Sequence, residues 1–387
     1  MKLNTKKFIR NIIICLIAFV VVSFILNYAP GFKRDKFAEV TNLIIDDEDL
    51  TENLNHNIYI SENGVIYLSI KDIENMFDKN IYYDEEFKTI ITTSNTKTAI
   101  MSLEDSKIII NGVEQNLQSK VLKMEEIIYI PISELELVYN ISTKYVKDTD
   151  IVVIESLNKG LIKATVEEKA TIKFKPRLLS KNVGEINKGD VVSCYYTTSK
   201  GWRLIRKEDG TLGYVKANVL TDEYIVRQDF DDEIKTAELI TDLEDGNILN
   251  LYNNQETEKI MIKTLFNFEA NGTIYAEEEN IDTDNYAIWA TISNKGLEKY
   301  TNELIKNYKT RTELIDKVVN FVTKYRVRGM NIDFQKVDDQ NSFDRFIIEL
   351  APRLRELGIT TNVILNNSFE EENLVGVVDY LISEKGE

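Results

Sequence analysis

Histidine and cysteine are scarce in this sequence of 387 residues. The chain has one histidine, His56, and two cysteines, Cys15 and Cys194, which lie far apart. A single histidine makes a histidine-based metal centre or a Ser-His-Asp triad hard to assemble. Two distant cysteines provide no disulfide framework. We therefore expect folded parts that depend on packing alone, with no metal and no other cofactor.

Positive charge is also in short supply. Lys and Arg number 47 against 64 Asp and Glu, which gives a formal net charge of -17. Proteins bind nucleic acid largely by neutralising phosphates with Lys and Arg, so nucleic acid is not an expected partner. The hydrophobic share of 43% is normal for folded protein. The length predicts two or three domains.

The first long apolar run follows a cluster of basic residues. Residues 12–26 are apolar, and four basic residues precede them: Lys2, Lys6, Lys7 and Arg10. About 20 apolar residues span a bilayer, and basic flanks stay in the cytoplasm. Residues 1–30 are predicted to form a single-pass anchor in the cell membrane, with the rest of the chain on the outer side. The alternative, a cleaved signal peptide, needs a small-residue site that Asn27-Tyr28-Ala29 matches poorly.

A polar, acidic stretch at 31–57 predicts a linker, and an internal repeat follows it. The strand-like segment 66–70 recurs at 128–132, and 89–91 recurs at 151–153. Between the copies, 107–113 predicts a strand that ends in an Asn-Gly turn. The α+β layout of residues 58–157 resembles the copper amine oxidase N-terminal-like stalk domain of exported bacterial proteins. Copper is not implied, because a Cu(II) site favours imidazole ligands.

Short strands with glycine-marked turns fill residues 161–222, which predicts a small β-barrel. A Lys-Gly-Asp turn, a Gly-Trp strand and a Gly-Tyr-Val strand occur in this order. That succession resembles the bacterial SH3-like domain, a family that often binds cell-wall peptides. The resemblance makes Trp202 and Tyr214 candidate substrate-binding residues. The alternative is that both only pack the barrel core.

Strands and helices alternate over residues 235–387. The segments 258–266, 286–292, 329–334 and 361–365 are strand-like, and 312–325 and 342–357 have apolar residues at helical spacing. This alternation predicts parallel strands with helical crossovers, as in a TIM-type (β/α) barrel. The whole chain is thus predicted to be multidomain: membrane helix, repeat stalk, small barrel and incomplete (β/α) barrel.

The segment 325–335 resembles the fourth strand of family 18 glycoside hydrolases, whose motif is Asp-Gly-x-Asp-x-Asp-x-Glu. Side chains alternate along a strand, so Asn331, Asp333 and Gln335 are expected to point into the barrel mouth. In that family the glutamate protonates the glycosidic oxygen, and the neighbouring aspartate orients the substrate's N-acetyl group. Here Gln335 replaces the glutamate, and an amide cannot release a proton near neutral pH. Asn331 and Arg328 replace the other two acids.

If residues 378–382 form the sixth strand of the resembled barrel, no sequence is left for strands seven and eight, so a barrel without its last two strands is expected. The family's Met-x-Tyr-Asp pattern, which would fall on 384–387, is also absent. Trp289, on an earlier strand, is a candidate platform for sugar stacking, with a core role as the alternative. The leading hypothesis is a membrane-anchored envelope protein that binds N-acetylglucosamine-containing glycan or peptidoglycan without hydrolysis. The alternatives are an active hydrolase on such glycans, rescued by Asp338 or Asp339, and a structural envelope protein or truncated gene product.

Overall fold

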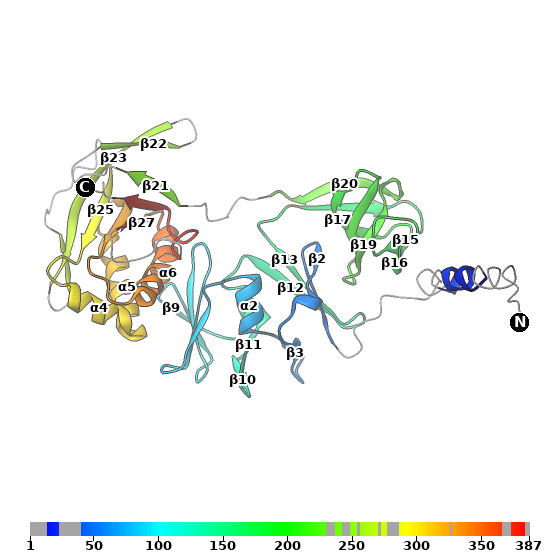
Figure 1. Cartoon of the computed structure of the whole chain (residues 1–387), viewed down its shortest axis with the longest axis horizontal. Helices are drawn as coiled ribbons and strands as arrows, with labels where there is room; N and C mark the ends of the chain where they lie inside the picture. Colours follow the sequence, from blue (N-terminus) through cyan, green and yellow to red (C-terminus); the bar gives the residue numbers. More distant parts are fainter. Residues whose placement is uncertain are drawn as a thin grey trace, which may run out of the picture. The chain divides into compact units, whose positions relative to one another are not determined.

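The structure is a computed structural model of the chain (Figure 1). It describes residues 14–22, 40–229, 237–241, 248–253, 256–269, 272–276, 286–325, 327–365 and 373–383. Strands dominate and helices are few. The chain divides into two compact units, Met1–Asp72 with Leu135–Asp231 and Ile73–Glu134 with Asp232–Glu387. Residues of the predicted stalk therefore occur in both units.

The predicted anchor is described only in part. Residues 14–22 are helical, and the remainder of 1–30 lies outside the described residues. Within the part of the chain that the structure describes, no helix is both long and apolar enough to cross a membrane. The membrane anchor stays a prediction.

The first unit begins with a four-stranded sheet of order β12-β13-β1-β2. Its strands are β1 (Asn42–Ile45), β2 (Glu48–Asp49), β12 (Ile141–Val146) and β13 (Ile151–Ser156). Residues 42–49 were expected to belong to a solvated linker, and this expectation is corrected. Leu43 and Ile44 are fully buried, because β1 pairs in parallel with β13.

Each copy of the repeat places a helix directly after a strand. In the first unit β3 (Tyr59–Ile60) pairs with β4 (Ile66–Ser69), and in the second β10 (Leu122–Met124) pairs with β11 (Ile127–Pro131). The short helices α2 (Ile70–Met76) and α3 (Ile132–Leu135) follow β4 and β11. The 3-10 turn η1 (Thr51–Asn53) precedes β3.

A seven-stranded antiparallel sheet occupies residues 161–227 of the first unit, in the order β16-β15-β19-β18-β17-β14-β20. Its strands are β14 (Leu161–Val166), β15 (Ala170–Lys173), β16 (Asn182–Ile186), β17 (Val191–Thr197), β18 (Trp202–Arg206), β19 (Leu212–Lys216) and β20 (Leu220–Arg227), with the 3-10 turn η2 (Ala217–Val219) before β20. Alternating apolar residues such as Ile172, Val192 and Val215 form its core.

The second unit contains a five-stranded antiparallel meander, β5-β6-β7-β8-β9. Its strands are β5 (Tyr82–Asp84), β6 (Thr89–Thr93), β7 (Thr98–Ser102), β8 (Lys107–Ile110) and β9 (Val113–Asn116). The predicted Asn-Gly turn joins β8 to β9. Asn111 has a φ of 49° and Gly112 a φ of 84°, the pair of positive values that a two-residue type I′ turn requires.

We expect Gly112→Ala to destabilise the second unit by about 2 kcal/mol, because an L-residue at positive φ is strained. A Cβ added there would also lie 3.0 Å from Arg353 Nη2. Gly358→Ala is the matched control, since Gly358 has a φ of 71° and open space where its Cβ would be. Urea denaturation of both variants should show the smaller loss, about 1 kcal/mol, for Gly358→Ala. Equal losses would show that the Arg353 contact costs nothing.

A half-barrel sheet forms the rest of the second unit, in the order β21-β28-β27-β26-β25-β23-β22, with β24 beside β23. The strands are β21 (Glu238–Thr241), β22 (Ile248–Asn253), β23 (Glu256–Phe268), β24 (Ile274–Ala276), β25 (Ala287–Ser293), β26 (Val327–Asp333), β27 (Thr360–Leu365) and β28 (Tyr380–Ser383). All neighbours from β21 to β23 in that order are parallel. Strand β21, which comes first in the chain, pairs with the last strand, β28. Within the described residues, the sheet order at this edge therefore differs from the chain order.

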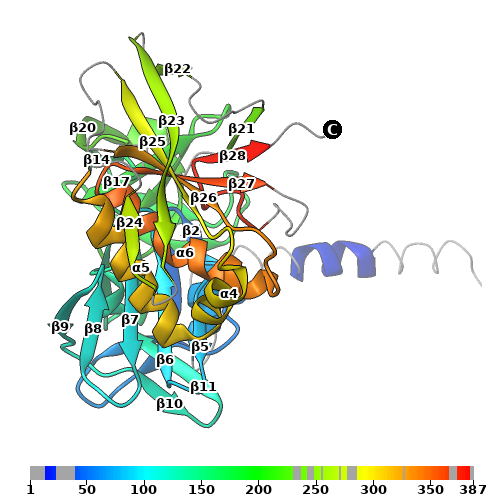
Figure 2. The same ribbon diagram turned by 90° about the vertical axis from the view of Figure 1, so that its left-hand side faces the viewer.

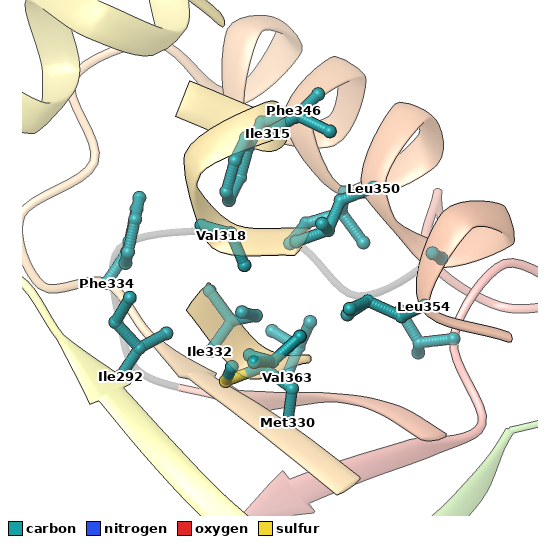
Figure 3. Packing of buried hydrophobic residues seen from close by; sticks show 14 of the residues in the cluster. Ile292, Ile315, Val318, Met330, Ile332, Phe334, Phe346, Leu350, Leu354 and Val363 are labelled. Atoms are coloured by element: carbon teal, nitrogen blue, oxygen red, sulfur yellow. The ribbon is translucent and has the colours of Figure 1, made fainter. Parts of the chain in front are cut away.

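Three helices lie on one side of this sheet (Figure 2). They are α4 (Glu298–Lys306), α5 (Tyr308–Val322) and α6 (Gln340–Glu356). Figure 3 shows Val318 of α5 and Leu350 of α6 directed toward Ile332 and Val363 of the strands. α5 begins four residues before the predicted 312, where the side chain of Asn307 caps Lys309 N.

Candidate functional site

Three neighbouring strands present their side chains in register on the face away from the helices. Thr291 of β25 lies beside Asn331 of β26, and Asn331 lies beside Asn362 of β27. One step nearer the carboxyl ends, Ser293 lies beside Asp333. Ligands of parallel α/β sheets bind outside the carboxyl ends of the strands. Ser293 and Asp333 are therefore at the position where a site is expected.

The predicted alternation along β26 is confirmed for the helix-facing residues. Ile332 and Phe334 are buried in the core that the sheet shares with α5 and α6. The ring of Phe334 stacks on that of Phe346, with centroids 5.4 Å apart. This packing fixes the direction of the strand, so Asn331 and Asp333 face the other way.

Asn331 is an internal residue of the sheet, with an exposed fraction of 0%. Its Nδ2 donates to Thr291 Oγ1 at 3.1 Å, and its Oδ1 accepts from Asn362 Nδ2 at 2.8 Å. Both ends of its amide are therefore engaged within the sheet. The expectation that Asn331 faces substrate at the barrel mouth is corrected: it is covered, and it ties three strands together.

Asp333 and Gln335 lie together at the carboxyl end of β26, and both are half-buried. The Gln335 side-chain amide donates to Asp333 Oδ1, and Ser293 Oγ donates to Asp333 Oδ2 at 3.2 Å. Each carboxylate oxygen thus accepts one hydrogen bond, although a carboxylate offers about four acceptor positions. Asp333 keeps capacity for a further donor such as an amide N–H.

Asn294 holds the backbone of Gln335 in place. Its Oδ1 accepts from Gln335 N at 2.7 Å, and its Nδ2 donates to Gln335 O at 3.2 Å. Asn302 of α4 donates to the next carbonyl, Lys336 O, at 2.8 Å. Ser293, Asn294 and Asn302 were not among the site residues expected from the sequence. Ser293 and Trp289 are separated by an even number of residues on one strand and therefore share a face. This spacing is the one sequence signal that could have indicated Ser293.

The loop after β25 continues into a shallow hollow at the first turn of α4. Its lining consists of Gly296, Leu297, Glu298, Lys299, Tyr300 and Glu303. Hydrogen bonding to backbone amide and to Lys336 holds the pKa of Glu298 below its usual range. The hollow begins three residues after Ser293 in the chain, and its lining includes charged side chains and one aromatic ring.

Trp289 does not fit the role of a sugar-stacking platform. Its side chain is 1% exposed and packs against Ile260 and Ile262. The ring of Tyr380 lies 4.8 Å away, centroid to centroid. No face of the indole is open to a ligand, so this expectation is corrected in favour of the core role.

Trp202 and Tyr214 lie in the seven-stranded sheet of the first unit. Trp202 is 4% exposed, with Lys216 Nζ 4.5 Å from its ring centroid, which corrects its expected role in binding. Tyr214 is half-buried, and its hydroxyl hydrogen-bonds that of the exposed Tyr196. Burial and the Tyr196 hydroxyl raise the pKa of Tyr214 to about 12. Tyr214 and Tyr196 form a surface pair of rings.

The described residues contain no group of three or more His, Cys, Asp or Glu side chains placed to hold a metal ion. His56 Nδ1 lies 3.3 Å from Ser69 Oγ, which is a structural hydrogen bond.

Comparison with known families gives one match. Residues 45–154 match the copper amine oxidase N-terminal domain, which confirms the resemblance of the predicted stalk. The match covers less than half of the chain. No curated protein matches the sequence.

Comparison with solved structures gives chitinases and a spore cortex-lytic enzyme. A chitinase from Chromobacterium violaceum has a TM-score of 0.28 at 20% identity over 32% of this chain and 47% of its own. The Bacillus cereus spore cortex-lytic enzyme SleL has a TM-score of 0.30 at 19% identity over 32% and 33%. The Ostrinia furnacalis Group IV chitinase has a TM-score of 0.28 at 15% identity over 32% and 42%. The chain spans less than half the length of each, and similarities of this size establish neither fold nor activity.

Proposed function

We propose that this protein is a membrane-anchored envelope protein whose half-barrel sheet binds N-acetylglucosamine-containing cell-wall glycan without cutting it. The observation that carries the proposal is the pair of Asp333 and Gln335 at the carboxyl end of β26. The motif of β26 resembles that of family 18 glycoside hydrolases, but an amide stands at the position of the proton donor. An amide preserves shape and hydrogen bonding and cannot supply a proton.

Asp333 is the group with which an acetamido N–H would bond in this proposal. Ser293 and Gln335 fix the carboxylate from two sides, and Asn294 fixes Gln335. Such support keeps a binding group in one rotamer, which lowers the entropy lost on binding. Within the described residues, the side chains that hydrogen-bond to Asp333 are a hydroxyl and an amide, and neither can act as an acid.

An active hydrolase would need another acid, and the neighbouring candidates are Asp338 and Asp339. Both are exposed, and Asp339 accepts a hydrogen bond from Ser342 at the start of α6. Asp339 therefore serves the helix terminus. A purely structural role remains the second candidate, and the burial of Trp289 and Asn331 favours it.

Binding and cleavage separate these functions. The full-length protein should bind chitooligosaccharides or peptidoglycan and release no fragments. Asp333→Asn should weaken binding about tenfold or more, since hydrogen bonds to a charged acceptor contribute about 1.5–3 kcal/mol. Asp338→Asn, which removes an exposed carboxylate on the following loop, should leave binding unchanged.

Gln335→Glu alone should restore little turnover, because Asn331 is engaged inside the sheet and catalytic residues act together. Hydrolysis of a fluorogenic N-acetylglucosamine oligomer by the unmodified chain, abolished by Asp333→Ala, would refute the non-catalytic assignment. Absence of any binding would favour the structural role.

A further inference from the structure

A hollow of about 330 Å³ lies between the two large sheets of the first unit. One wall comes from β12 and β13 of the four-stranded sheet. The other comes from β14, β17 and β18 of the seven-stranded sheet. All five strands belong to the same compact unit. The hollow is far along the chain from Asp333 and has no part in the proposed glycan site.

Each wall presents a polar row in register. Lys163 of β14 lies beside Ser193 of β17, and Ser193 lies beside Arg206 of β18. On the opposite wall Ser142 of β12 lies beside Glu155 of β13. Cross-strand neighbours in register point to the same side of a sheet. Both rows therefore line the hollow together.

Arg206 joins the two walls. Its side chain is 4% exposed, donates to Asp46 O at 2.8 Å and forms an ion pair with Glu155. The hydroxyl of Tyr195 donates to the same Asp46 carbonyl at 2.8 Å. A buried guanidinium with two partners across the interface fixes the distance between the sheets. These contacts hold the two walls of the hollow in a fixed arrangement.

Three donors in the hollow have no side-chain partner among the residues that the structure describes: Lys163, Ser142 and Ser193. Ser193 is 8% exposed and belongs to the lining of the hollow. The three donors are open to the hollow, and they favour a ligand that brings acceptor oxygens.

The charges around the hollow decide which acceptor fits. Arg206 is paired with Glu155, Lys144 with Glu208 and Lys207 with Asp209. Among the cations that line the hollow, Lys163 has no ion-pair partner within the described residues. One uncompensated cation with two hydroxyl donors suits a singly charged oxyanion. The nearby glutamates would oppose a doubly charged phosphate.

We propose that this hollow binds the carboxylate of a small ligand of amino-acid to dipeptide size. Lys163 neutralises the charge, and Ser142 and Ser193 donate to the oxygens. The volume lies at the lower end of the range for small-molecule sites, which suits a ligand of this size.

The test uses the full-length protein with two probes that differ in charge. N-acetylglycylglycine carries a carboxylate, and its C-terminal amide has nearly the same shape without the charge. Calorimetric or NMR titration should show saturable binding of the acid, and at least tenfold weaker binding of the amide. Lys163→Gln should weaken binding of the acid about tenfold, and Ser193→Ala, which is nearly isosteric, by about threefold.

Lys169→Gln is the matched control, because Lys169 lies near the same sheet and pairs with the exposed Glu185 at 2.8 Å. It should leave binding unchanged. Equal binding of acid and amide, or no loss in Lys163→Gln and Ser193→Ala, would overturn the proposal. Inorganic phosphate forms the third arm: if it binds more tightly than the acid with the same dependence on Lys163, the carboxylate assignment is wrong. If Lys163→Gln does not fold, the Ser193→Ala and amide comparisons decide.

Discussion

Replacing Glu349 with alanine should lower the free energy of unfolding of the second unit by about 3–5 kcal/mol. Glu349 of α6 and Arg311 of α5 form an ion pair whose side chains are 2% and 4% exposed. Arg311 Nη2 lies 2.9 Å from Glu349 Oε1, and Arg311 Nε lies 3.2 Å from both carboxylate oxygens. Removal of one partner would leave a buried, unpaired charge.

Glu349 also connects the helices to the β5–β9 meander, through its side chain and its backbone carbonyl. Tyr82 of β5 donates to Glu349 Oε1 at 2.9 Å, and Thr98 of β7 donates to Glu349 O at 2.8 Å. Burial, and then the Glu349 charge, raise the pKa of Tyr82, so its hydroxyl stays a donor across the accessible pH range. Loss of the Glu349 side chain therefore also removes the acceptor of Tyr82.

Thermal and urea denaturation of the full-length protein measure this effect. Glu104→Ala is the matched control, because the Glu104–Lys88 pair has side chains 66% and 56% exposed. Exposed pairs contribute about 0–1 kcal/mol, so the control should be nearly neutral. The double variant Arg311→Met/Glu349→Leu should recover most of the loss, since an apolar pair can replace a buried ion pair. A loss below about 1 kcal/mol in Glu349→Ala would show that the pair is open to water.

The second large effect concerns Trp289 and Gly329, which lie side by side on β25 and β26. Trp289→Ala should cost about 3–5 kcal/mol, as for other buried tryptophans. Gly329→Ala should cost about 1–3 kcal/mol by overpacking. A Cβ on Gly329 would lie 2.6 Å from Trp289 Cδ1 and 2.6 Å from Thr360 Oγ1, and both distances are shorter than non-bonded contacts of a Cβ atom with carbon or oxygen.

A double-mutant cycle tests the contact between the two residues. Gly329→Ala should cost less when Trp289 is already alanine, because half of the clash is gone, and the coupling should be about 0.5–3 kcal/mol. Additive losses, measured by urea denaturation, would show that Gly329 is required for another reason. Near-wild-type stability of Trp289→Ala would reopen the possibility of a surface role for the indole.

Local patterns in the sequence predict much of the fold. The Asn111-Gly112 dipeptide specifies its own turn, because few other residue pairs accept two positive φ values. The alternation of Asn331, Ile332, Asp333 and Phe334 specifies the two faces of β26. In both cases the information lies within a few residues.

The remaining features depend on residues distant in the chain. The apolar run Leu43-Ile44-Ile45 is too short to specify a strand by itself, and its partner β13 lies about a hundred residues away. Helix α4 is mostly polar and was missed, since few of its residues contact the core. Whether Trp289 stacks on a sugar or fills the sheet depends on Tyr380, and sequence spacing does not reveal that contact. From the motif alone, the Asn331 amide is expected to be available to a ligand. In the structure its hydrogen bonds go to Thr291 and Asn362.

The division of each unit into two separated chain segments also constrains how the chain folds during synthesis. Each unit is built from two separated segments, and the Tyr82–Glu349 contact joins residues 267 positions apart. The β5–β9 meander emerges from the ribosome long before α5 and α6, so its helix-facing side is uncovered in the interval. Contacts of such sequence separation slow folding, and exposed strands favour aggregation while they wait. Charged side chains such as Lys88, Glu104, Lys107 and Glu114 on the meander would keep the nascent sheet soluble until α6 arrives.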